Sequence, residues 1–203
     1  MRIFFLLIFL SHLVAGCAVQ RIQDRDQWLA ESSRVYKNRD EEQIIRAAEA
    51  ILNSADPGDF VFVHHPRGFR ATRQWFVTVI VASAAGNNTY EFSVERVGDG
   101  VRASIMIDQF QNGAGKVNVS VISSYRLFFN WLDYALGLGK EWVTCEQASE
   151  KFQIENANLA PGICGPGITS QGLNPVQPKA EWTRDNRVPP IAPVSDRRRL
   201  ERR

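Results

Sequence analysis

The sequence predicts an α+β fold in which an antiparallel sheet of four to five strands is packed by an N-terminal helix and C-terminal helices. Apolar residues recur at spacings of three and four before residue 53 and again after residue 126, which indicates amphipathic helices. Between these segments, apolar and polar residues alternate over several stretches that are separated by glycine-rich turns. Such alternation indicates antiparallel strands with one face in water. An antiparallel run flanked by helices is typical of a two-layer α+β domain.

The first predicted helix covers residues 38–53. Asn38 or Asp40 can cap its start, and the acidic residues of its first turn suit the positive end of the helix dipole. Its apolar stripe consists of Ile44, Ile45, Ala48, Ile51 and Leu52. The Asp-Pro-Gly-Asp segment at 56–59 ends the helix. The preceding residues 17–37 are largely polar, and we expect them to form a tether with a short helix near residues 27–35.

The predicted sheet is a meander of four long strands and a shorter one. The strands are expected over residues 60–64, 71–84, 89–97, 101–110 and 116–123. Residues 86–88 and 98–100 are rich in Gly, Asn and Asp, which tolerate the left-handed backbone of tight hairpin turns. We therefore expect a hairpin turn at each of these two places.

Helical spacing returns at Arg126, and a further helix is predicted over residues 141–152. Residues 38–168 are thus expected to form a single domain. Beyond it, residues 169–203 have no apolar periodicity and are rich in Pro and Arg, so we predict a disordered tail. The last 25 residues carry eight Lys or Arg and four Asp or Glu, whereas residues 3–178 carry 15 basic and 18 acidic side chains. A mildly acidic body argues against nucleic-acid binding.

The first sixteen residues have the pattern of a signal peptide. Arg2 precedes an apolar run over residues 3–10, which is too short to cross a bilayer that needs roughly 20 apolar residues. The run ends in Val14-Ala15-Gly16 followed by Cys17. This ending resembles the lipobox of bacterial lipoproteins.

The resemblance implies cleavage before Cys17 by signal peptidase II and attachment of diacylglycerol to its thiol, so that the lipid holds the mature protein to a membrane. Two or three acyl chains give lasting attachment where one does not. Position 18 is Ala and not the Asp that retains such proteins at the inner membrane, which favours the outer membrane, facing the periplasm. The alternative is an ordinary signal peptide that is cut near Ala18.

With Cys17 acylated, Cys145 and Cys164 remain as an even pair in an oxidising compartment, and we predict a disulfide between them. Closing this loop stabilises by roughly 3 kcal/mol in the chain-entropy model. A zinc site at these two thiols lacks further ligands at suitable spacing. We therefore expect no metal and no cofactor.

Two groups of side chains are candidates for binding. Arg67, Arg70 and Arg73 recur at every third residue and could bind a phosphate, a lipid headgroup or an acidic partner, or could instead pair with the acids of the body. His64 and His65 are adjacent at a strand end, so they point to opposite faces and cannot chelate one metal together. A surface role is the simpler interpretation of both histidines, and a general base beside Asp59 or Asp108 is the alternative.

No catalytic or nucleotide-binding motif occurs in the sequence, so we predict that the protein is not an enzyme. The leading hypothesis is an envelope lipoprotein that docks another envelope protein through its sheet edge or through the aromatic helix at residues 126–138. The alternative is a small module that binds an amphiphile or lipid in the periplasm. The sequence leaves the oligomeric state open.

Overall fold

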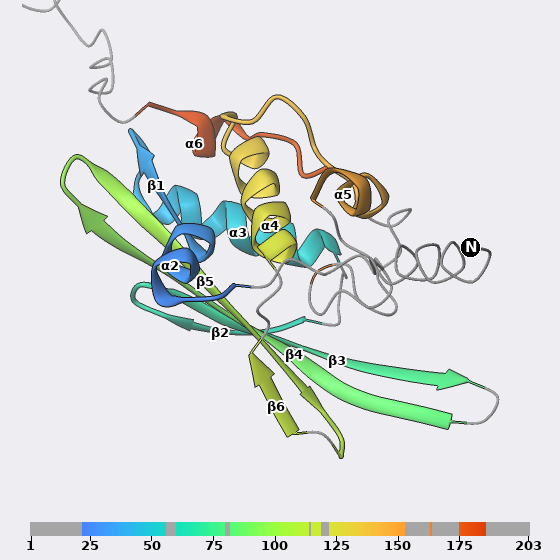
Figure 1. Cartoon of the computed structure of the whole chain (residues 1–203). Helices are drawn as coiled ribbons and strands as arrows, with labels where there is room; N and C mark the ends of the chain where they lie inside the picture. The colour runs from blue at the N-terminus through green and yellow to red at the C-terminus, as the bar shows by residue number, and fades with distance from the viewer. Residues whose placement is uncertain are drawn as a thin grey trace, which may run out of the picture.

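The structure, a computed structural model, describes residues 22–55, 60–79, 82–113, 115–118, 122–152, 163 and 175–185. In this part of the chain, a six-stranded antiparallel sheet forms one layer and the helices form the other. The described helices lie on one side of the sheet (Figure 1). The predicted α+β architecture is confirmed.

The elements follow one another in a simple order. They are α2 (Arg25–Ser32), β1 (Ser33–Lys37), α3 (Glu41–Ala55), β2 (Phe60–His65), β3 (Gly68–Val79), β4 (Ala82–Val97), β5 (Gly100–Gln111), β6 (Gly115–Asn118), α4 (Ile122–Ala135), α5 (Cys145–Phe152) and α6 (Ala180–Thr183). The strand order is β1-β5-β4-β3-β2, and β6 also pairs with β5. Because β4 occupies one side of β5 along its whole length, β1 and β6 share the other side. The sheet therefore ends in β2 at one edge and in β1 and β6 at the other.

Helix α3 begins with a capping box at Asp40 and Gln43. The Gln43 backbone N–H donates to the Asp40 carboxylate at 2.7 Å, and the Asp40 N–H donates to the Gln43 side-chain oxygen at 3.0 Å. These two bonds satisfy two donors that the first turn of a helix leaves without partners. The expected cap at Asp40 is confirmed.

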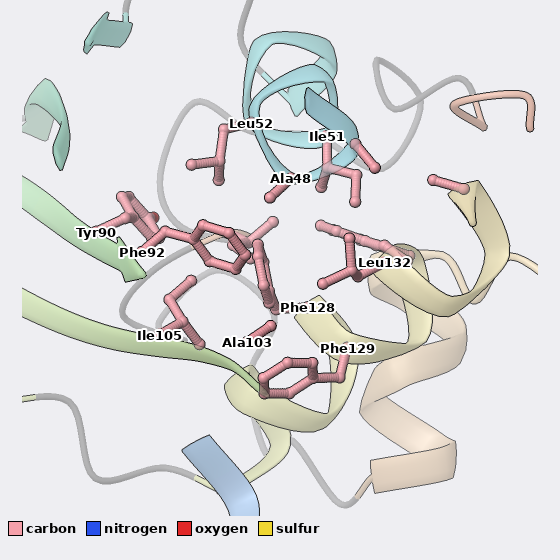
Figure 2. Packing of buried hydrophobic residues seen from close by; sticks show 14 of the residues in the cluster. Ala48, Ile51, Leu52, Tyr90, Phe92, Ala103, Ile105, Phe128, Phe129 and Leu132 are labelled. Atoms are coloured by element: carbon pink, nitrogen blue, oxygen red, sulfur yellow. The ribbon is translucent and has the colours of Figure 1, made fainter. Parts of the chain in front are cut away.

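The core fills the space between the sheet and the helices. Phe92 of β4 packs against Phe128 of α4, with ring centroids 5.9 Å apart, and stacks on Phe69 of β3 at 5.3 Å. Figure 2 shows α3 and α4 bringing their apolar stripes onto these strands, with Ala48, Ile51, Leu52, Phe129 and Leu132 around the same cluster. The predicted stripe of α3 is therefore its buried face, with Ile45 only partly buried.

The chain after α4 is held to the body through Trp131. Its ring stacks on Trp142 at 5.0 Å with an interplanar angle of 7°, and its indole N–H donates to the Val143 carbonyl at 2.6 Å. The Val143 N–H in turn donates to the Asn130 side chain at 3.0 Å. These contacts place the start of α5 against α4.

The expected tether at residues 17–37 is wrong for its described part. Strand β1 pairs with β5, and α2 is fixed to α4 because Arg126 binds Glu31 through two hydrogen bonds of 2.5 and 3.0 Å. Trp28 also packs edge-on against Tyr125, with centroids 5.2 Å apart. This segment looks polar because β1 is an edge strand whose side chains are mostly exposed. The short helix expected within it is present as α2.

The predicted hairpin turn at residues 86–88 is also wrong. These residues lie inside β4, which runs from Ala82 to Val97 and pairs with both β3 and β5. Gly86 is required for packing there, since a Cβ atom at this position would lie 2.0 Å from the Phe110 carbonyl oxygen and 2.6 Å from the Trp75 ring. The turn predicted at residues 98–100 is confirmed, and Gly98 has a φ of 58°.

Two further boundaries differ from prediction. Helix α4 begins at Ile122, four residues before the expected start, and β6 is described only to Asn118. Ser123, Ser124 and Tyr125 are buried in the first turn of α4. Ile122 and Tyr125 are residue types that favour strands by local propensity, and tertiary packing overrides this preference.

Part of the predicted disordered tail belongs to the body. Residues 175–185 include α6, and Trp182 within it is only 2% exposed. The Gln43 side-chain amide donates to the carbonyls of Glu181 at 2.8 Å and Arg184 at 3.2 Å. A single large aromatic residue and a buried amide therefore anchor a segment without apolar periodicity. The remainder of the tail, residues 169–174 and 186–203, lies outside the described residues.

Candidate interaction surface

The face of the sheet that points away from the helices, here called the open face, carries most of the exposed apolar surface. In the described part of the chain, eight large hydrophobic side chains are exposed, and six of them belong to this face by their register. They are Val35, Val61, Val63, Phe76, Met106 and Phe110. They are spread over the face, with Val35 at the β1 edge and with Val61 and Val63 side by side on β2 at the opposite edge.

The two edges of the sheet differ in charge. At one edge, β1 and β6 carry Arg34, Lys37 and Lys116. At the other edge, β2 contains no Lys, Arg, Asp, Glu or Pro between Phe60 and His65. Charges and prolines on edge strands prevent unwanted pairing with other chains. The β2 edge lacks this protection, and its Val61 and Val63 are 66% and 62% exposed.

The charged groups of the open face are paired with each other. Arg70 binds Glu91 at 2.6 Å, Lys116 binds Asp108 at 2.7 Å, and Arg102 binds Glu95 at 2.7 Å. These pairs leave the face close to neutral, with apolar residues between them. Such a surface suits an uncharged partner better than an anionic polymer.

Arg67, Arg70 and Arg73 do not form one binding site. Arg70 and Arg73 are three residues apart on β3, so their side chains point to opposite faces, and Arg73 is buried on the helix side beside Tyr90. Arg67 is exposed in the turn between β2 and β3. The alternative, pairing with an acid of the body, is confirmed for Arg70.

The histidines occupy separate surface positions, as their adjacency predicts. His64 lies 3.3 Å from Glu49 of α3, whereas His65 lies 3.9 Å from Glu91 on the open face. Asp108 pairs with Lys116 instead, and Asp59 lies outside the described residues. The histidines thus contact glutamates on opposite sides of the sheet.

Of the three cysteines, only Cys145 is among the described residues, where it is buried and disulfide-bonded. Cys17 and Cys164 lie outside the described residues, so the acylation of Cys17 and the pairing of Cys145 with Cys164 stay predictions. Ile163, next to Cys164, is buried in the same core cluster as Cys145. In the described segments, no group of three His, Cys, Asp or Glu side chains could hold a metal ion.

Sequence reasoning missed a half-buried acid, Asp133 of α4. Tyr36 of β1 donates a hydrogen bond to its carboxylate at 2.9 Å, and Arg34 forms an ion pair with it. Burial raises the pKa of Asp133 above its ordinary value, while Arg34 and the Tyr36 hydroxyl lower it in part. Both oxygens of this carboxylate have partners, so the cluster joins β1 to α4 and serves the fold.

The aromatic helix proposed as a docking face is part of the core. Phe128, Phe129 and Trp131 of α4 are each at most 1% exposed. They pack against the sheet, α3 and Trp142, so they offer no surface to a partner. Of the two docking surfaces expected from the sequence, the sheet edge is exposed, whereas the helix surface keeps only Leu138 at its end as an exposed large apolar residue.

Among the described residues, no helix is both long enough and apolar enough to span a membrane. Comparisons of the chain with protein-family models, with curated proteins and with solved structures find no match.

Proposed function

We propose that this protein is a lipid-anchored, non-enzymatic envelope lipoprotein that docks another envelope protein through the β2 edge of its sheet. In this proposal the lipid on Cys17 holds it to the outer membrane, facing the periplasm. The partner contributes an extended strand that continues the sheet beyond β2. Main-chain hydrogen bonds provide the affinity of such strand addition, and the alternating side chains provide its specificity.

The observation that carries the proposal is the pair Val61 and Val63 on an edge strand without charges. Strand β2 pairs only with β3 in the described part of the chain, so its outer backbone groups face away from the sheet. Val61 and Val63 lie on the open face, where side chains of an added strand can pack beside them. Cross-strand pairs of apolar β-branched residues are favourable by about 0.2–1 kcal/mol each.

The alternative function, binding of a small amphiphile between sheet and helices, requires space inside the two layers. That space is filled by Phe69, Phe92 and Phe128 together with the apolar stripe of α3. The surface hollows among the described residues, such as the one between Arg70, Met106 and Lys116, are open to solvent. These observations favour docking of a protein over enclosure of a ligand.

The anchor is tested by the Cys17→Ser variant in the native bacterial host. Without a thiol to acylate, the precursor is expected to keep its leader, because signal peptidase II acts on the acylated cysteine. The measurement is the mass of the protein in the membrane fraction, with and without globomycin, an inhibitor of that peptidase. A Cys17→Ser protein that is still cut and still fractionates with the membrane would contradict lipidation.

Docking at β2 is tested by replacing both Val61 and Val63 with Lys. Two cations on the edge strand remove apolar contact and disfavour strand addition, so co-purification of the partner is expected to fall about tenfold or more, which corresponds to about 1.4 kcal/mol. A photoreactive amino acid at Val63 is expected to crosslink to the same partner in native membranes. The crosslink is formed in the membranes, and both co-purification and crosslinking are then measured on protein extracted from them.

Val35→Lys is the matched control for this experiment. Val35 is also an exposed valine on the open face, but it lies on β1 at the opposite edge. Val35→Lys is expected to retain the partner, and a photoreactive amino acid at position 35 is expected to give no crosslink. If the double variant melts like the parent protein and still retains the partner, docking does not use the β2 edge.

A further inference from the structure

Two adjoining hollows lie along strands β3, β4 and β5. The first, here called the central hollow, has a volume of about 540 Å³, and the second, here called the distal hollow, has a volume of about 450 Å³. Both volumes are within the range of about 300–1,000 Å³ that is typical of small-molecule sites. Asn87 and Phe110 line both hollows, so the two lie side by side.

The strand register explains the shape of the central hollow. Thr72 of β3, Thr89 of β4 and Asp108 of β5 stand directly opposite one another on the open face, and these short side chains form the floor. The rows on either side carry longer side chains, which are Arg70, Glu91 and Met106 on one side and Asn87 and Phe110 on the other. A short row between two long rows leaves a depression in the sheet surface.

The central hollow is polar but carries no net charge. Lys116 binds Asp108 at 2.7 Å and Arg70 binds Glu91 at 2.6 Å, so its two cations and two anions cancel. The partly exposed side chains of Thr72, Asn87 and Thr89 make no hydrogen bond within the described part of the chain. The hollow therefore offers hydrogen-bond donors and acceptors together, in a neutral setting.

The distal hollow combines amides with aromatic rings. Among the described residues that line it, the amides belong to Gln74, Asn87 and Asn112, and the rings belong to Trp75, Phe76 and Phe110. No charged residue is among them. Phe76 and Phe110 are 69% and 39% exposed, so their rings are available for contact. The face of an aromatic ring carries partial negative charge and attracts polarised C–H groups.

We propose that the two hollows together bind an uncharged oligosaccharide. A sugar hydroxyl donates and accepts hydrogen bonds at once, as a Thr hydroxyl does, so it matches a surface that offers both kinds of group. The C–H face of a pyranose ring packs on aromatic rings such as Phe110. This inference goes beyond the proposed docking function, because it uses no residue of β2 and needs neither a lipid on Cys17 nor a protein partner.

The same observations disfavour other ligands. An extended peptide is recognised largely through its main chain, but β4 and β5 are paired on both sides at Thr89 and Asp108, so the floor has no free backbone groups to offer. A nucleic acid or another polyanion needs a surplus of cations, which the paired charges do not provide. An amphiphile needs an apolar floor, whereas this floor consists of two hydroxyls and a carboxylate.

The spacing of the two hollows sets the length of the ligand. Thr89 lies in the central hollow and Ala85 in the distal hollow, four residues apart on β4. At about 3.4 Å per residue, this distance is about 14 Å, which a chain of about three pyranose rings spans. A monosaccharide fills only one hollow and is therefore expected to bind more weakly than a tetrasaccharide.

The test uses the chain from residue 18 onward, which contains every described residue. Isothermal titration calorimetry is carried out with three uncharged tetrasaccharides, namely cellotetraose, chitotetraose and maltotetraose. At least one of them is expected to bind with a Kd of about 1 mM or below, and the corresponding monosaccharide is expected to bind about tenfold more weakly or worse. Nuclear Overhauser contacts are expected between the sugar protons and the ring protons of Phe110.

Two conservative variants test the assigned contacts. Phe110→Leu keeps an apolar side chain but removes the ring, and it is expected to weaken binding about tenfold. Thr89→Val keeps the shape of the floor but removes a hydroxyl, and it is expected to weaken binding about threefold or more. Ser104→Ala is the matched control, since it removes a hydroxyl of the open face outside both hollows, and it is expected to bind as the parent does.

Four results would overturn the proposal. These are the absence of binding by all three tetrasaccharides at millimolar concentration, parent-like affinity of both Phe110→Leu and Thr89→Val when their melting temperatures match the parent's, a loss of affinity in Ser104→Ala as large as theirs, and tighter binding of a sulfated tetrasaccharide than of its uncharged counterpart. The last result would assign the hollows to anions instead. None of these results bears on Cys17 or on Val61 and Val63, so the two proposals fail separately.

Discussion

Replacing Trp182 with Ala is expected to destabilise the protein by about 3 kcal/mol, although this residue lies in a segment without apolar periodicity. Removing a buried Trp side chain costs about 3–5 kcal/mol through lost contacts and the cavity left behind. Trp182 is 2% exposed and belongs to the main core cluster. Its indole N–H is buried without a hydrogen-bond partner among the described residues, and losing that unsatisfied donor offsets part of the cost.

The measurement is thermal and urea unfolding of the chain from residue 18 onward. For a protein of this size, about 3 kcal/mol lowers the melting temperature by about 6–12 °C. Trp182→Phe is the matched control, because it keeps an aromatic ring and removes the unpartnered N–H, and a change below about 1 kcal/mol is expected. A Trp182→Ala protein as stable as the parent would show that residues 175–185 do not stabilise the body.

The central architecture could be predicted because its periodic signals are strong. Helix α3 combines a capping box at Asp40 with an apolar stripe through Ile44, Ala48 and Ile51, so local propensity and burial agree. Strand β5 alternates buried Ala103, Ile105 and Ile107 with more exposed neighbours, as a half-buried strand should. In both elements, one segment contains enough information to specify its own fold.

The segments that were mispredicted depend on distant partners. Strand β1 has one buried apolar side chain, Tyr36, and its position is fixed by pairing with β5 and by the contact of that tyrosine with Asp133. Helix α6 is held by Trp182 and by the Gln43 amide, a residue about 140 positions earlier in the chain. Neither partnership leaves a periodic pattern in the local sequence. A lone Trp within a polar stretch was the one available signal for α6.

The candidate surface was predictable only in part. The sequence correctly places His64 and His65 on opposite faces, because alternation along a strand is a local property. The same rule places the side chains of Arg70 and Arg73 on opposite faces. Their spacing of three residues along the chain therefore does not bring them together in one binding site. Which strand lies at an edge depends on the pairing of all strands, so the unprotected edge at β2 emerges only from the fold.

Gly86→Ala is expected to cost about 2–3 kcal/mol even though its backbone is ordinary extended strand. A Cβ atom there would lie 2.0 Å from the Phe110 carbonyl oxygen and 2.6 Å from the Trp75 ring, well inside van der Waals contact. Strands β4 and β5 must separate to admit it, and their hydrogen bonds near Gln111 weaken as they do. Overpacking of this kind costs typically about 1–3 kcal/mol, and a clash with backbone belongs to the upper part of that range.

The control for this prediction is Gly98→Ala in the β4–β5 turn, where a Cβ atom would meet nothing within 4 Å but φ is 58°. It is expected to cost about 1 kcal/mol from backbone strain alone.

Adding Trp75→Ala to Gly86→Ala should restore only part of the lost stability, since it removes the ring contact and leaves the Phe110 carbonyl in place. Urea unfolding of the parent, of Gly86→Ala, of Trp75→Ala and of the double variant separates these contributions through a double-mutant cycle. Full rescue by Trp75→Ala would mean that the ring alone requires a glycine here, whereas a Gly86→Ala protein as stable as the parent would mean that β4 and β5 are not closely paired at this point.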